Sequence, residues 1–224
     1  LSSSSAASDV YKRQDFTPDW VWTKARNSGI ANLMYDANRG ATKYLQVDSA
    51  NPEGTGADSL TDFTTNGFIV GADSSTTGVN NNGTTYVAWN WKAGGEPSAD
   101  NSAGAGNTPT ANSVKIDGSN LGSALAGTIP ATRLSANTTA GFSIVTYTGD
   151  GNTGASVAHG LGLVPEIILI KNRDESQSWV FNANFTTKYR LVLDTASNNS
   201  GDFSTYMGTQ TDDRIVFGLS LIHI

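Results

Sequence analysis

Apolar and polar residues alternate along this chain in short runs, which is the pattern of strands. The two-residue alternation of a strand covers residues 20–23, Tyr86–Trp91 and Phe142–Tyr147. A fourth run, Ile167–Ile170, is continuously apolar and β-branched, which predicts a strand buried on both faces. Glycine and asparagine turn signals separate the runs, while residues 41–46 fit a helix or a strand. The pattern predicts an all-β fold of sandwich or jelly-roll type.

The sequence contains one unit twice. Pro18 recurs as Pro165, 147 residues later, and a Lys-x-Arg motif follows the first predicted strand of both copies. An offset that is nearly constant over about fifty residues predicts two related folded units. The matched segments are 16–27 with 163–174, 34–38 with 180–184 after a small gap, and 68–71 with 215–218 at the original offset.

The two copies are predicted to be truncated on opposite sides. The first unit, residues 15–95, lacks the N-terminal strands that open the second. The second unit, residues 141–218, lacks the tryptophan-rich strand that closes the first. Residues 96–140 are rich in Gly, Ala, Ser and Thr, which predicts a linker with one ordered patch at residues 113–134.

Both ends of the chain resemble translated adapter sequence. Residues 4–14 match the in-frame translation of a sequencing-library adapter, and residues 219–224 match its reverse complement. We therefore expect residues 1–14 and 219–224 to be adapter-derived artefacts around an open reading frame from metagenomic reads.

Composition excludes several classes of partner and chemistry. Charged residues make up 15 % of the chain and the formal net charge is −6, so an acidic chain without a basic cluster predicts no nucleic-acid partner. No apolar run approaches the roughly 20 residues of a membrane span, so we expect no membrane insertion. The absence of cysteine excludes disulfides, thiolate metal sites and a cysteine nucleophile.

Three loop features resemble functional motifs but favour structural roles. Residues 149–154 fit G-x-G-x-x-G, yet the glycines and proline that follow exclude the helix that a dinucleotide site needs. His159 precedes a predicted strand and is expected to bond backbone in a turn, with a ligand contact as the alternative. Residues 194–202 predict a solvated turn, because their carboxylates and amides do not follow the spacing of an EF-hand calcium loop.

The tryptophans are the candidates for stacking on a sugar, and the repeat supplies a test of that role. Trp20 and Trp22 are replaced in the second copy by Ile167 and Leu169, which favours core packing over an aromatic binding face. The other pair, Trp89 and Trp91, shares a strand face with Val87, and core packing is favoured there as well.

The Lys-x-Arg motif is most simply a solvated or salt-bridged strand end. Its two copies are Lys24 with Arg26, and Lys171 with Arg173. No carboxylate pair stands out from the loops as an acid and base for glycoside hydrolysis.

Several segments resemble repeated domains of uncharacterised marine bacteriophage virion proteins that are described as tail-fibre-like. The resemblance covers most of residues 15–95 and 136–218, and residues 116–134 resemble linker elements of phage fibres. The segments that carry it are PDWVWTKAR at 18–26, DANRGATKYL at 36–45, LTDFTTNGF at 60–68, NGTTYVAWNWKAGG at 82–95 and GFSIVTYTG at 141–149.

The resemblance implies a non-enzymatic structural module of a phage virion, part of a tail fibre or host-adhesion protein in the extracellular particle. The implied partners are other virion proteins and a host surface glycan, with a homotrimer as the candidate oligomer. We predict no catalytic, cofactor-binding or metal-binding residues. Two alternatives stay open: a carbohydrate-binding or glycan-depolymerising fibre domain, and a lectin-like surface adhesin of a bacterium.

Overall fold

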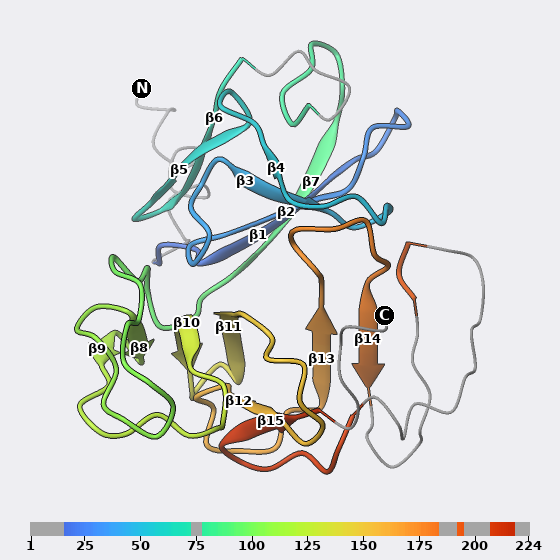
Figure 1. Cartoon of the computed structure of the whole chain (residues 1–224). Coiled ribbons are helices and arrows are strands. Elements are labelled where there is room, and N and C mark those ends of the chain that lie inside the picture. Colours follow the sequence, from blue (N-terminus) through green and yellow to red (C-terminus); the bar gives the residue numbers. More distant parts are fainter. Residues whose placement is uncertain (1–15, 73–77, 184–191, 195–206, 218–224) are drawn as a thin grey trace, which may run out of the picture.

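The computed structural model describes residues 16–72, 78–183, 192–194 and 207–217 (Figure 1). Over these ranges the chain is all-β and sandwich-like, with fifteen strands in five sheets and no helix. The predicted artefacts at residues 1–14 and 219–224 lie outside the described residues, as do residues 195–202 of the predicted solvated turn.

The first unit is built on a five-stranded antiparallel sheet. Its central strand β1 pairs with β2 on one edge and with β7 on the other. The alternating runs predicted at residues 20–23 and Tyr86–Trp91 are β1 and β7, and β3 falls within residues 41–46. In sheet order the strands are β4 (Gly54–Thr55), β3 (Lys43–Gln46), β2 (Leu33–Asp36), β1 (Trp20–Ala25) and β7 (Tyr86–Trp91).

A hairpin covers one face of this sheet. It consists of β5 (Leu60–Thr64) and β6 (Gly67–Val70), joined at the predicted Asn-Gly turn, where Gly67 has a φ of 153°. Side chains of the hairpin pack against the sheet face that carries Val21, Leu33 and Tyr35, each of which has no exposed surface. One face of the five-stranded sheet is therefore covered from within its own unit.

Residues 96–140 connect the units and also contribute strands to the second one. Three of its strands lie at or beside the predicted ordered patch: β8 (Val114–Ile116), β9 (Ser119–Asn120) and β10 (Ala131–Asn137). They form a four-stranded sheet with β11 (Phe142–Tyr147), in the order β11-β10-β8-β9, where β8 and β10 run parallel. Small side chains that read as linker composition fit here because they are buried between strands.

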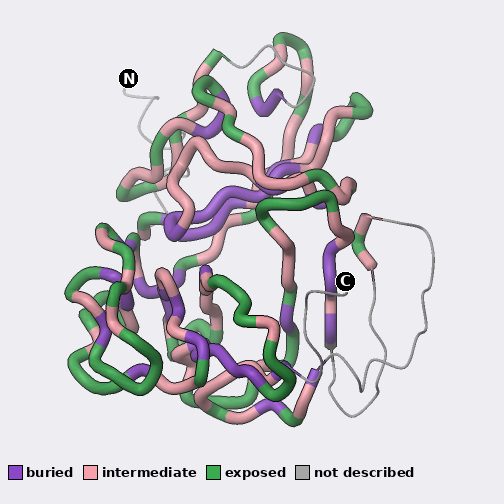
Figure 2. Tube along the Cα trace, viewed as in Figure 1, coloured by how far each residue is buried: buried purple, intermediate pink, exposed green. Residues whose placement is uncertain are grey.

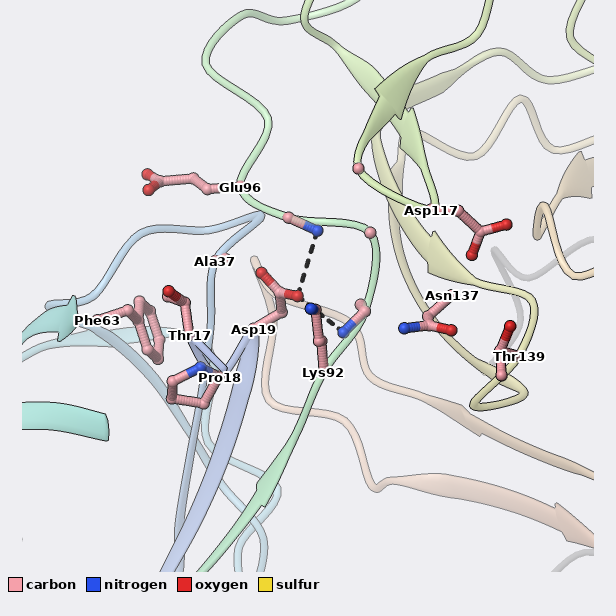
Figure 3. A pocket seen from close by; sticks show the side chains of 14 residues that line it. Thr17, Pro18, Asp19, Ala37, Phe63, Lys92, Glu96, Asp117, Asn137 and Thr139 are labelled. Carbon is pink, nitrogen blue, oxygen red and sulfur yellow. Dashed lines mark hydrogen bonds between the residues drawn. The ribbon is translucent and has the colours of Figure 1, made fainter. Parts of the chain in front are cut away.

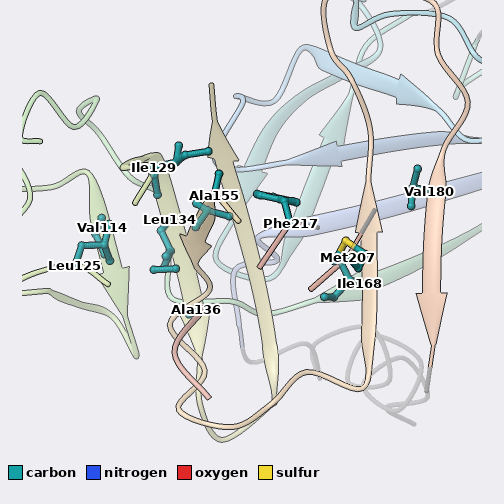
Figure 4. Packing of buried hydrophobic residues seen from close by; sticks show 13 residues of the cluster. Val114, Leu125, Ile129, Leu134, Ala136, Ala155, Ile168, Val180, Met207 and Phe217 are labelled. Atoms are coloured by element: carbon teal, nitrogen blue, oxygen red, sulfur yellow. The ribbon is translucent and has the colours of Figure 1, made fainter. Parts of the chain in front are cut away.

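Two short antiparallel pairs complete the second unit. One joins β12 (Ser156–Ala158) to β15 (Arg214–Val216), and the other joins β13 (Ile167–Ile170) to β14 (Val180–Ala183). They share one hydrophobic core with β8 and β10 (Figure 4). The buried members of this core are Val114, Leu125, Ile129, Ala131, Leu134, Ala136, Ala155, Val157, Ala158, Ile168, Val180, Met207 and Phe217.

Strand register confirms the internal repeat at the offset of 147 residues. Leu60 pairs with Val70 in the first unit, and Met207 pairs with Phe217 in the second, each 147 residues later. The same offset relates β1 and β2 to β13 and β14. It places Phe181 opposite Leu169 as Met34 lies opposite Trp22, so the gap expected between residues 34–38 and 180–184 is absent from the pairing.

The apolar run Ile167–Ile170 forms the predicted strand, but the expectation that both its faces are buried is wrong. Ile168 is 6 % exposed and packs in the core, whereas Ile167 is 59 % exposed and Leu169 is 38 % exposed. Figure 2 shows the central strands of the first unit largely buried, while exposed and intermediate segments alternate along and around β13. One face of the β13–β14 pair is open because no described segment packs against it.

Candidate functional site

The junction between the two units is the most elaborate site in the described structure. It lies on the face of the five-stranded sheet opposite the β5–β6 hairpin, where Trp20 is 9 % exposed. Trp91 packs beside Trp20 with ring centroids 4.4 Å apart, and Phe142 of β11 lies 5.5 Å from Trp20. Phe142 also stacks on Trp91 at 6.2 Å. Aromatic side chains from both units thus form one cluster.

Trp179 brings a second aromatic side chain of the second unit to this junction. It is 3 % exposed and packs with Leu45 and Val47 of the first unit. Its indole Nε1–H donates to the backbone oxygen of Gln46 at 2.8 Å, so the polar end of the ring is satisfied across the junction.

An ion network links the units beside the aromatic cluster. The guanidinium of Arg173 donates to both carboxylate oxygens of Glu53, at 2.8 and 3.1 Å. Arg39 lies 3.4 Å from the same carboxylate and also pairs with Asp36 at 2.5 Å. The Arg39 side chain is 3 % exposed and that of Glu53 is 13 % exposed, so these charges are largely removed from water.

The network changes the titration of its members. Burial alone would raise the pKa of Glu53, but hydrogen bonds and charge from Arg173 and Arg39 outweigh it and hold the pKa below its usual value. The hydrogen bonds from Arg173 to Glu53 raise the pKa of that guanidinium against its own burial. The junction therefore keeps Glu53 ionised at neutral pH.

Backbone oxygens on each side of the junction accept hydrogen bonds from the other. The Asn38 side chain donates to the backbone oxygen of Ile144 at 2.7 Å, and Arg133 donates to that of Asn38 at 3.1 Å. Lys171 donates to the backbone oxygen of Ala50 at 3.1 Å. These contacts fix the orientation of one unit on the other as well as their proximity.

A hollow of about 630 Å³ lies next to the junction and holds three carboxylates, Asp19, Glu96 and Asp117 (Figure 3). Asp19 accepts backbone N–H groups from Ala93 at 2.7 Å and Gly95 at 3.2 Å. Asp117 accepts the N–H and hydroxyl of Thr138, which hold its pKa below the usual value. Both carboxylates are committed to holding turns, and Glu96 is exposed.

Asp19 has an unusual electrostatic position within this hollow. Burial raises the pKa of its carboxyl group, against the opposing effect of the two backbone donors and of Lys92. The residue is only 2 % exposed. Its position at the start of β1 lets it hold the chain that leaves β7, so its role is to anchor the turn at Ala93–Gly95.

His159 occupies the turn position predicted for it. It is 2 % exposed, its Nδ1 accepts the N–H of Leu161, and its Nε2–H donates to the backbone oxygen of Thr211 at 3.2 Å. Burial lowers the pKa of this imidazole against the opposing charges of Asp213 and Asp212. The loop at residues 149–154 is followed by strand β12 and not by a helix, as predicted.

The structure confirms two of the four tryptophan assignments in full. Trp20 and Trp91 pack in the junction, and Trp22 is partly buried against it. The prediction of core packing is wrong for Trp89, which is 44 % exposed and lies over Trp22 with centroids 5.5 Å apart. Trp89 sits at the rim of the cluster, where no described side chain of the second unit covers it.

The Lys-x-Arg motifs diverge as the two strand ends differ in surroundings. Arg173 is salt-bridged, as predicted, whereas Arg26 is exposed and Lys24 donates to the backbone oxygen of Ile30. The partner Glu53 lies in a Pro-Glu-Gly loop without a sequence signal of its own, so sequence reasoning missed it. Phe142 and Trp179 were also missed as junction residues, because periodicity does not say which unit a side chain packs on.

Two searches within the described ranges gave no candidates. No group of three or more His, Asp or Glu side chains there is arranged to hold a metal ion. Those ranges likewise contain no helix with the length and apolar character required to cross a membrane.

Comparison with known proteins identifies the repeated unit as a family domain. Comparison with curated proteins and with solved structures finds no match. A family model described as "Domain of unknown function (DUF7483)" matches residues 2–117 and again residues 115–221. The two matches meet next to β8, on the chain that leads from the tryptophan-rich strand into the second unit. Because these matches span nearly the whole chain, the protein belongs to the DUF7483 domain family and contains that domain twice.

Proposed function

We propose that this chain is a non-enzymatic structural module of a phage virion, part of a tail fibre or host-adhesion protein. The observation that carries the proposal is the junction: two copies of one domain are held in fixed orientation by an aromatic cluster and a buried ion network. Repeated domains that stack in this way build extended, load-bearing assemblies. The resemblance of the quoted segments to virion proteins places such an assembly in a phage particle.

The chemistry of the hollow beside the junction supports a structural role. Asp19 and Asp117 spend their carboxylate oxygens on backbone and hydroxyl donors of neighbouring turns. A retaining or inverting glycosidase instead needs two carboxyls free to face one substrate across a cleft. The exposed loops of an array would offer many weak contacts to a host surface, multiplied by valency.

Mass spectrometry of purified marine virus particles tests the proposed location. Nuclease-treated particles banded on a density gradient should contain tryptic peptides of this chain, for example residues 116–133, which end at Arg133. The cell-envelope fraction of the same sample is the control. Enrichment in the envelope fraction would contradict the virion assignment and favour the bacterial adhesin.

Carbohydrate binding is a second candidate function, favoured by one observation. Trp89 is 44 % exposed beside Trp22, which offers an aromatic face for a sugar ring. Trp89→Ala should abolish binding on a glycan array if this face is used. Ile69→Ala is the matched control, because Ile69 is 50 % exposed on the β5–β6 hairpin. Equal glycan signals from both variants would exclude this site.

A further inference from the structure

The open face of the β13–β14 pair is the counterpart of the junction face in the first unit. At the offset of 147 residues, Ile167 and Leu169 occupy the positions of Trp20 and Trp22, with the same strand register. In the first unit this face is covered by Phe142 and Ile144 of the following unit. In the second unit it is exposed.

The exposed apolar side chains of the described structure concentrate at this place. Seven large hydrophobic residues are exposed in total, and four of them lie in the short stretch of residues 163–169. Leu163 is 72 % exposed and Val164 is 50 % exposed, next to Ile167 and Leu169. A contiguous apolar patch of this kind marks an interaction site more often than a bare surface.

The edge of β13 is open as well. In the first unit β1 pairs along one edge with β2 and along the other with the tryptophan-rich strand β7. β13 pairs with β14, and no other described strand pairs with it. A hollow of about 690 Å³ lies between β11 and the end of the β13–β14 hairpin, lined by Val145, Tyr147 and Ile170 among others. Unpaired strand edges with adjacent space accept further strands.

We propose that the open edge and face of β13 form a docking site for one further domain of the same family, following in series. A strand of the β7 type pairs along the edge of β13, and a strand of the β11 type lays its counterparts of Phe142 and Ile144 on Ile167 and Leu169. This inference rests on the proposed function as a module of a repeat array. The partner is a further domain and not the β11 of a second copy, because Phe142 is already packed against Trp20 and Trp91 in its own chain.

Thiol labelling of an extended chain tests the docking site. The extended protein consists of residues 1–217 followed directly by a second copy of residues 71–217, so that the repeat spacing is kept. The chain has no cysteine, so Ile167→Cys in the first copy creates a single thiol whose labelling rate reports exposure of the face. We expect the thiol to react at least about tenfold more slowly in the extended protein than in the 224-residue chain, equivalent to about 1.4 kcal/mol of docking.

Three variants make the result specific. Phe142→Asp in the appended copy alone should restore fast labelling, while the internal junction keeps its own Phe142. A separate chain with Ile69→Cys should label equally fast in both lengths. Ala136→Cys in the appended copy should label slowly, because Ala136 is fully buried when the unit is folded.

Two outcomes would overturn the proposal. One is equally fast labelling at position 167 in both lengths while position 136 of the appended copy is protected. The other is labelling in the 224-residue chain that slows with protein concentration, because a second copy would then be the occupant. Neither outcome depends on whether the chain occurs in virus particles, so failure of docking and failure of the virion assignment are distinguishable.

Discussion

Arg173 of the second unit holds Glu53 of the first through two hydrogen bonds across 120 residues of sequence. The same carboxylate lies within 3.4 Å of Arg39, whose side chain is almost fully buried. One loop carboxylate therefore serves cations from both domains. The backbone adds to this contact, since the N–H of Glu53 donates to the backbone oxygen of Arg173 at 2.8 Å.

Removing this carboxylate should loosen the junction. Glu53→Gln leaves Arg39 buried with fewer acceptors, so we expect a loss of about 2–4 kcal/mol of unfolding free energy. Arg173→Ala should cost less, about 1–2 kcal/mol, because that side chain is 42 % exposed. Urea denaturation followed by tryptophan emission measures both. Arg26→Ala, at the equivalent exposed position, is the control and should be close to neutral.

The repeat offers a matched pair of apolar truncations. Trp20→Ala removes a side chain packed against Trp91 and Phe142, and should cost about 3–5 kcal/mol. Ile167→Ala, 147 residues later, should cost less than about 1 kcal/mol because Ile167 is 59 % exposed. Equilibrium unfolding monitored by far-ultraviolet circular dichroism compares them. Equal costs would mean that the open face is covered in the isolated chain.

The geometry at Asp19 predicts that its shape matters more than its charge. Asp19→Asn keeps an oxygen for the N–H groups of Ala93 and Gly95, and burial already disfavours the charged form, so we expect a cost below about 1 kcal/mol. Asp19→Ala leaves both donors unpaired and should cost about 2–4 kcal/mol. Denaturation at pH 7 separates the two, and similar large losses in both would assign the stability to the carboxylate charge.

His159 should make stability fall under mildly acidic conditions. Burial holds the pKa of the folded imidazole below 6.5, so the unfolded chain binds the proton more readily. Stability is therefore full above pH 6.5 and is lost as pH falls from 6.5 through the lower folded pKa. His159→Gln should flatten the pH dependence of the urea midpoint between pH 7 and the onset of carboxylate titration. An unchanged slope in that variant would show that another group is responsible.

Periodicity in the sequence predicted which side chains share a strand face. It placed Trp20 with Trp22, and Trp89 with Trp91, and the repeat indicated that the first pair acts through bulk. It could not predict whether a face is covered. Leu169 and Trp22 are equivalent positions, yet the neighbour that covers the Trp22 face belongs to the next domain along the chain.

Composition was a weaker guide than periodicity. Residues 96–140 read as linker because their alanines, serines and glycines carry little apolar bulk, but Ala131, Ala136 and Ser135 are fully buried where strands approach closely. Gly94 shows the same effect, since a side chain there would meet the backbone oxygen of Ala136. The ion network was unpredictable for another reason: Glu53 and Arg173 meet only when two domains dock.

All five tryptophans of the chain lie in or beside the junction, four of them from the first domain and Trp179 from the second. The intrinsic emission of this protein is therefore an optical gauge of one boundary and is almost blind to the interior of the second domain. Indoles as close as Trp20 and Trp91 also couple their excited states, which gives a circular dichroism couplet that vanishes when the domains part. A spectrometer alone can thus separate undocking from unfolding.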